Sequence, residues 1–200
     1  TVTGTVTGKQ LEGQSQPLGS ATLTVSKLGD AGEEITVPVS TTGEFTVDLD
    51  FGSTYVFNAS SDGYGLISRR WDVFSETKHN QLSFELLQRR TSNVPLSDEG
   101  DAVELDMGAS PMGSTYSATL IIEPGDLALD SDPSAAVTGD IEVRHMVWDP
   151  AEADDIADSY PGNLFTTGMD EDAGEIDFPL TSYGMFDVDF FLNGEPVNVR

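Results

Sequence analysis

Two short acidic segments carry the side chains best suited to binding a metal ion. They are Asp130-Ser131-Asp132 and Asp170-Glu171-Asp172. Calcium takes about six to eight oxygen ligands, often carboxylates and carbonyls gathered from loops. Neither segment fits the helix-loop-helix calcium pattern, so solvated loop charges are the competing interpretation. Calcium is the one cofactor that the sequence suggests, with the candidate ligands Asp130, Asp132, Asp170 and Asp172.

Three aromatic residues form a second candidate site, for a sugar. Trp148 directly precedes a stretch of weak periodicity, Tyr160 lies within it, and Tyr183 lies just beyond it. An aromatic ring offers a broad apolar face with a polar edge, which suits stacking against a pyranose ring. Core packing or anchoring of a loop is the competing interpretation for each ring. The candidate ligand-binding residues are Trp148, Tyr160 and Tyr183.

The sequence has none of the short patterns that indicate an enzyme. Gly-x-Ser-x-Gly, His-Glu-x-x-His and a glycine-rich phosphate loop before a helix are all missing. No cysteine and only two histidines occur, which excludes thiolate chemistry and disfavours a zinc site. His145 shares one face of a predicted strand with Ile141, Val143 and Val147, so we expect a core or interface histidine. The sequence therefore predicts a protein that is not an enzyme.

The chain is strongly acidic. Its 200 residues include 35 Asp and Glu against 9 Lys and Arg, for a formal net charge of −26. Such a surface repels phosphate backbones and anionic lipids, so we expect no nucleic-acid or membrane-surface binding. A cation, a basic partner or a salty medium would each suit this charge. No apolar run is long enough for a membrane helix, so no membrane insertion is expected in this fragment.

The start of the chain and its lack of cysteine bear on location. The chain begins inside an apparent strand, with no signal peptide before Thr1. We therefore expect a mature or excised fragment whose targeting signal lies outside these residues. A chain without cysteine cannot be a disulfide scaffold, and it fits a bacterial secreted protein. The expected location is extracellular or at the bacterial cell surface.

Short segments with alternating side chains must position these candidate sites. The first half contains Val2–Thr7, Ala21–Val25, Glu44–Leu49, Thr54–Phe57 and Gln81–Leu87. Threonine, valine and aromatic residues at period two suit half-buried strands, and the frequent turn signals are typical of a β-sandwich. Gly43 is expected to adopt a positive φ in a hairpin turn. The predicted fold class is all-β, with two consecutive β-sandwich domains.

The motifs of the first half follow one another in a specific order. They are Val2–Val6, Pro17–Val25, Thr41–Phe45, Gly52–Tyr55 and Asp62–Tyr64. In this order they resemble the carboxypeptidase regulatory-like domains, although Thr42 and Ser20 depart from the family pattern. The resemblance implies a transthyretin-like, Greek-key sandwich of about seven strands, a common size for such domains. It also implies a structural or binding module, since family members of this kind usually carry no catalytic residues.

The character of the sequence changes after residue 88. Residues 1–88 are predicted to form the first sandwich, residues 89–95 a linker and residues 96–200 a second sandwich. Within the second, residues 149–177 have weak periodicity and are predicted to form a long irregular loop. Long loops inside compact domains are often functional, so a binding site is expected there first.

The second half has its own strand signals. Strands are predicted at Ile141–Trp148 and Gly184–Phe191, and the dipeptide Asn193-Gly194 predicts a type I′ hairpin turn. A looser resemblance links this half to the sandwich that follows such a domain in large bacterial surface proteins. It rests on Trp148–Pro150, Pro161–Leu164 and Leu180–Phe186. This resemblance implies an extracellular, non-catalytic setting.

Two functions are compatible with these patterns. The first is a non-catalytic structural or adhesive module of a secreted or surface-anchored bacterial protein, with another surface protein as partner. The alternative is a carbohydrate-binding module that docks a polysaccharide through the aromatic rings, assisted by calcium. Both interpretations predict that the chain performs no catalysis.

Overall fold

The computed structural model is all-β. It describes residues 1–29, 34–74, 80–97, 100–109, 117–129, 131–134, 137–148, 165–170, 174–179 and 185–199. Within these ranges no helix occurs, and so none is long and apolar enough to cross a bilayer. The chain divides into two compact units, an N-terminal unit (Thr1–Leu87 with Pro150–Tyr183) and a C-terminal unit (Gln88–Asp149 with Gly184–Arg200). The prediction of an all-β fold is confirmed.

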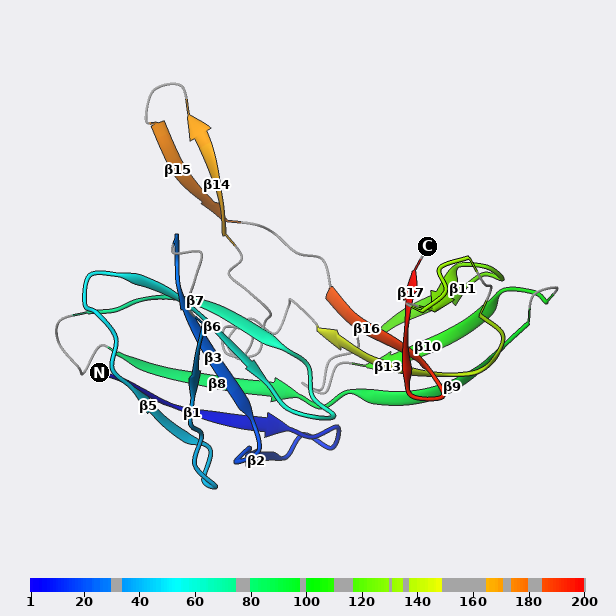
Figure 1. The fold of residues 1–200 in the computed structure, drawn as a ribbon, viewed down its shortest axis with the longest axis horizontal. Helices are drawn as coiled ribbons and strands as arrows, with labels where there is room; N and C mark the ends of the chain where they lie inside the picture. Colours follow the sequence, from blue (N-terminus) through cyan, green and yellow to red (C-terminus); the bar gives the residue numbers. More distant parts are fainter. Residues whose placement is uncertain are drawn as a thin grey trace. The chain divides into compact units, whose positions relative to one another are not determined.

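Two sheets make up the sandwich of the N-terminal unit (Figure 1). The first contains β1 (Val2–Lys9), β2 (Ser15–Pro17), β5 (Glu44–Val47) and β8 (Gln81–Leu87). The second has the order β4 (Glu34–Val37), β3 (Thr22–Lys27), β6 (Thr54–Ser60) and β7 (Ile67–Asp72). Side chains from both sheets form one buried core.

Three phenylalanines lie at the centre of this core. Phe45, Phe57 and Phe84 come from both sheets, and their ring centroids are 6.0–6.5 Å apart. Tilted rings at this spacing have favourable edge-to-face contacts. Leu82, Phe84 and Leu86 are all buried, so the predicted apolar face of Gln81–Leu87 is confirmed. Gly43 adopts the predicted positive φ of 78°.

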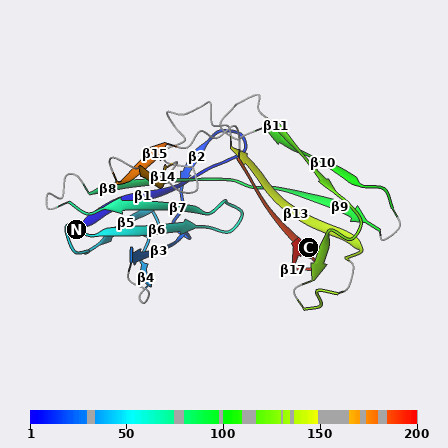
Figure 2. The same cartoon turned by 90° about the horizontal axis from the view of Figure 1, so that it is seen from above.

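The C-terminal unit contains a five-stranded antiparallel sheet. Its order is β12 (Leu127–Leu129), β17 (Glu195–Val199), β16 (Met185–Leu192), β13 (Gly139–Trp148) and β9 (Arg90–Leu96). A separate hairpin of β10 (Val103–Ala109) and β11 (Ser117–Ile122) packs on the apolar face of this sheet. Figure 2 shows β9 and β13 side by side, with this hairpin next to them. Asn193 and Gly194 both have positive φ, as a type I′ turn requires.

The segment predicted to be a linker is a strand instead. Residues 89–95 lie largely in β9, which pairs with β13 along its whole length. Val94 and Leu96 are buried on one face, so the segment has the alternation of a half-buried strand. Pro95 is tolerated because β9 ends the sheet order, and edge strands accept proline. The linker prediction is corrected accordingly.

The predicted irregular loop also contains strands. In the C-terminal part of residues 149–177, β14 (Phe165–Asp170) pairs with β15 (Gly174–Pro179), which extends two residues beyond it, as an antiparallel hairpin. Only Ile176 and Phe178 alternate with acidic residues, which is too short a run to signal a strand pair from sequence. The prediction of one continuous loop is therefore wrong over the hairpin. Residues 149–164 of the predicted loop lie outside the described residues.

Candidate functional site

The predicted calcium ligands are only partly described. Asp132 is exposed in the turn after β12, where its Oδ1 accepts hydrogen bonds from Ser134 N at 3.1 Å and Ser134 Oγ at 2.7 Å. Asp170 is the last residue of β14, opposite Gly174. Asp130 and Asp172 lie outside the described residues. Within the described ranges, no three His, Asp or Glu side chains are grouped to hold a metal ion.

The predicted sugar-binding rings lie mostly outside the described residues. Trp148 ends β13, and its backbone stands opposite Met185 in β16. Tyr160 and Tyr183 are not among the residues that the structure describes. Binding of a polysaccharide through these three rings therefore stays a prediction.

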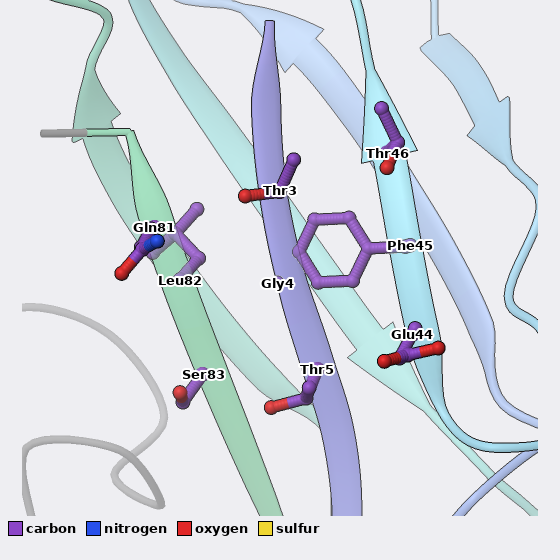
Figure 3. Close-up of a pocket in the computed structure, with 9 residues that line it drawn as sticks. All are labelled: Thr3, Gly4, Thr5, Glu44, Phe45, Thr46, Gln81, Leu82 and Ser83. Carbon is purple, nitrogen blue, oxygen red and sulfur yellow. The ribbon is translucent and has the colours of Figure 1, made fainter. Parts of the chain in front are cut away.

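A shallow depression of about 500 Å³ lies on the outer face of the first sheet of the N-terminal unit. Figure 3 shows β1 between β5 and β8 in this depression. Its outward side chains are hydroxyls, one amide and one carboxylate: Thr3, Thr5, Glu44, Thr46, Gln81 and Ser83. These groups donate and accept hydrogen bonds. Glu44 is the one titratable side chain among them, and its Oε2 already accepts a hydrogen bond from Thr42 Oγ1 at 3.0 Å.

The floor of the depression is closely packed. The ring of Phe45 lies against Gly4 of β1 (Figure 3), and Leu82 lies on the other side of the same strand. A Cβ atom on Gly4 would lie 2.0 Å from the carbonyl oxygen of Leu82 and 2.6 Å from Cζ of Phe45. Gly4 is therefore required for β1 to fit between its two neighbours. The depression is therefore a shallow surface feature of a polar sheet face, and the residues beneath it belong to the packed core.

The pairing of β1 with β8 is the most distinctive feature beneath this face. The two strands are parallel and share seven residue pairs, from Thr3–Gln81 to Lys9–Leu87. Figure 1 shows them side by side with their arrows in the same direction. Val2 and Val6 of β1 are buried in the same core as Phe84 and Leu86 of β8. The first and last strands of residues 1–87 are thus paired over the whole of β8 and all of β1 except Val2.

A buried polar cluster lies in the C-terminal unit. His145 is 1% exposed, and its Nε2 lies 3.0 Å from Ser92 Oγ. Its Nδ1 is buried and makes no hydrogen bond of full geometry with the described residues, although the backbone of Met107 lies close enough to act on the ring. Burial and the nearby guanidinium of Arg90 lower the pKa of His145, while the backbone of Met107 and the carboxylate of Asp106 oppose this shift. The prediction that His145 is a core residue is confirmed.

An ion-pair network holds the start of β9 to β16. The guanidinium of Arg89 donates to the carboxylates of Asp187 and Asp189, and its side chain is largely buried. Nearby in the sheet, Arg144 binds Glu142 at 2.6 Å and lies over the ring of Phe191 at 4.5 Å. A largely buried arginine that donates to two carboxylates is a strong charge-assisted contact. It fixes the point at which the chain enters the five-stranded sheet.

Sequence reasoning did not find the β1–β8 pairing, because strand adjacency is a long-range property. The opening strand and Gln81–Leu87 were each predicted, but alternation shows only which face of a strand is buried.

In the comparisons with known proteins, no family model matches this chain and no curated protein matches it. The site is therefore interpreted from its own geometry.

Proposed function

We propose that this chain is a non-catalytic structural module of a secreted or surface-anchored bacterial protein, and that its N-terminal unit resists tension along the chain. The observation that supports this proposal is the parallel pairing of β1 with β8. A module of this kind holds two points of a longer assembly at a fixed distance while they are pulled apart.

The direction of the two strands determines how tension loads them. Thr3 stands opposite Gln81 at one end, and Lys9 stands opposite Leu87 at the other. Tension on Thr1 and on Gln88 pulls the two strands in opposite directions along their own axes. The seven pairs must then slide past one another together, so their hydrogen bonds share the load. Each such bond contributes about 0.5–1.5 kcal/mol, and simultaneous rupture requires their sum.

Core packing adds to this resistance. Sliding β1 against β8 would drag Val2 and Val6 past Phe84 and Leu86 within a close-packed interior. The missing side chain at Gly4 allows Phe45 and Leu82 to close on β1 from both sides. Hydrogen bonding and packing therefore oppose the same movement.

Tension along the chain acts across the strands of the C-terminal unit, and this direction offers less resistance to unfolding. Arg90 at the start of β9 stands opposite His145 of β13, and His145 stands opposite Val188 of β16. Strand β17 runs back toward that end, from Glu195 opposite Leu192 to Val199. Tension between Arg90 and Val199 therefore acts across the strands. Antiparallel ladder bonds perpendicular to the strands can then break one pair after another.

Single-molecule force spectroscopy on the full chain tests the proposal. The chain has no cysteine, so Thr1→Cys and Arg200→Cys provide the only attachment points. We expect two unfolding steps, with the C-terminal unit at the lower force and the N-terminal unit at the higher force. Residues 1–87 contribute about 3.6 Å of contour length per residue when they extend.

A substitution at Gly4 shows which of the two unfolding steps belongs to the N-terminal unit. Gly4→Ala forces a Cβ into a packed site and should destabilise the N-terminal unit by about 1–3 kcal/mol. It should lower the force of the later step and leave the earlier step unchanged. Thr5→Ala, on the outer face of the same strand, is the matched control and should move neither step. If the step sensitive to Gly4→Ala comes first, the proposal fails.

A further inference from the structure

Three large apolar side chains are exposed at one end of the N-terminal unit. Leu28 is 52% exposed, Phe51 is 74% exposed and Phe74 is 52% exposed. Leu28 follows β3, Phe51 precedes β6 and Phe74 follows β7. We call these three residues the apolar tip. Single exposed apolar residues are common on soluble proteins, whereas several together mark an interaction surface.

Backbone hydrogen bonds join the three segments that carry the apolar tip. Leu28 N donates to Thr54 O at 2.9 Å, which ties the end of β3 to the start of β6. Gly52 N donates to Val73 O at 2.8 Å, and Val73 N donates to Ser53 O at 3.0 Å. The residues next to Phe51 and Phe74 are therefore bonded directly to each other. The apolar tip is therefore carried by segments that are hydrogen-bonded to one another within the sandwich.

A buried amide fixes the position of Phe74. Asn80 is 1% exposed, and its Oδ1 accepts a hydrogen bond from Phe74 N at 2.8 Å. Its Nδ2 donates to Phe74 O at 2.6 Å, and its own backbone oxygen accepts a hydrogen bond from Thr3 N at 3.0 Å. A surface that is already ordered loses little conformational entropy when a partner binds.

Three exposed carboxylates lie next to the apolar tip in sequence: Asp48 and Asp50 precede Phe51, and Asp72 precedes Phe74. Asp48 Oδ1 lies 3.8 Å from the N-terminal ammonium of Thr1. Asp72 Oδ1 accepts a hydrogen bond from Thr54 Oγ1 at 2.6 Å, and Asp50 lies 3.7 Å from Lys27 Nζ. The chain as a whole carries a net charge of −26. A second copy or an anionic lipid surface would bring like charges together here, whereas a basic partner would be attracted.

We propose that the apolar tip is a docking surface for a basic segment of another protein. An apolar side chain of that segment packs against Phe51 and Phe74, and its lysines or arginines face Asp48 and Asp50. In the complex, the apolar tip forms the buried centre of the interface, and the carboxylates form its polar rim. This surface is separate from the β1–β8 pairing, so either proposal can fail without the other.

The test uses the full chain, labelled with ¹⁵N, and a short helical peptide of leucine and lysine as the probe. We expect the peptide to shift the amide signals of Leu28, Phe51 and Phe74 at moderate ionic strength. The same peptide with glutamate in place of lysine should not bind, because the carboxylates repel it. Binding should weaken as salt is added, since exposed charges are screened.

Matched variants locate the contact. Phe51→Ser should weaken peptide binding about tenfold or more, as loss of an interface anchor does. Leu66→Ser is the control, since Leu66 is 49% exposed at the other end of the unit, where Gly65 N bonds Leu87 O. Asp50→Asn should reduce the salt dependence of binding, and Glu12→Gln, in the exposed turn after β1, should not. Thermal unfolding of each variant verifies that it folds.

Three results would overturn the proposal. The first is equal binding by Phe51→Ser and the unchanged chain, which would mean that the peptide binds the acidic surface without a specific site. The second is no binding of the basic peptide at all. The third is concentration-dependent self-association of the chain alone that Phe51→Ser abolishes, which would assign the tip to a second copy.

Discussion

At the scale of single residues, His145 shows how the C-terminal core tolerates a titratable group. Its ring is buried between the five-stranded sheet and the β10–β11 hairpin, with one hydrogen-bonded contact to Ser92. Arg90 from β9 and Asp106 from β10 act on it with opposite signs, and burial is the largest effect. The neutral ring is therefore the form that the folded chain favours.

This environment predicts a pH dependence of stability. The folded pKa of His145 is lower than the ordinary value of about 6.5, so the unfolded chain gains a proton first as the pH falls. The free energy of unfolding then decreases below about pH 6.5, by up to about 1.4 kcal/mol per pH unit, until the folded ring is also protonated. Above pH 6.5 this contribution is constant.

Proton NMR of the imidazole ring measures this pKa directly. His79→Asn leaves His145 as the only histidine, so its signal needs no further assignment. We expect a titration midpoint below 6.5 in the folded chain, and a higher midpoint once urea has unfolded it. A folded midpoint equal to or above the unfolded one would contradict the burial-driven shift.

At the scale of elements, local patterns predicted most strands but not their neighbours. The strands at Gln81–Leu87 and Ile141–Trp148 alternate clearly, and Asn193-Gly194 specifies its own turn. The parallel contact of β1 with β8 joins residues far apart in sequence, and no local signal encodes it. Strand β9 was missed because Pro95 and two arginines resemble a linker, while only Val94 and Leu96 show its buried face.

The candidate sites were harder to predict than the strands, for a related reason. Carboxylates and aromatic rings were selected by local density, but binding depends on which segments meet in space. Leu28 and Phe51 each precede a glycine in a turn. A large apolar residue in a turn is therefore the sequence feature from which the apolar tip could have been predicted. That signal indicates exposure, and it does not show that the segments are bonded together.

At the scale of the whole molecule, net charge governs the response to salt. A charge of −26 on 200 residues opposes compaction by self-repulsion, and added salt screens it. We expect the thermal midpoint to rise when sodium chloride is raised from low to high concentration. Each kcal/mol gained corresponds to roughly 4–8 °C for a unit of 60–100 residues and to roughly 2–4 °C for one of 150–250 residues. A midpoint that stays constant or falls would contradict this interpretation of the charge.

Calcium provides the matching control. At equal ionic strength, calcium and magnesium should stabilise the chain equally if the carboxylates are only solvated charges. A further rise of the thermal midpoint with calcium alone would indicate that calcium binds specifically, with ligands among Asp130, Asp132, Asp170 and Asp172. Asp170→Asn and Asp132→Asn, compared under that condition, would then show which acidic segment binds.

The most direct test of tension resistance compares two pulling directions on the same strand pair. Attachment at Thr1→Cys and Gln88→Cys shears β1 against β8, whereas attachment at Gln10→Cys and Gln88→Cys peels the two strands apart from their Lys9–Leu87 end. We predict a clearly higher unfolding force for the first pair of attachment points than for the second. Equal forces in the two directions would contradict the claim that the parallel β1–β8 pairing makes this unit resistant to tension.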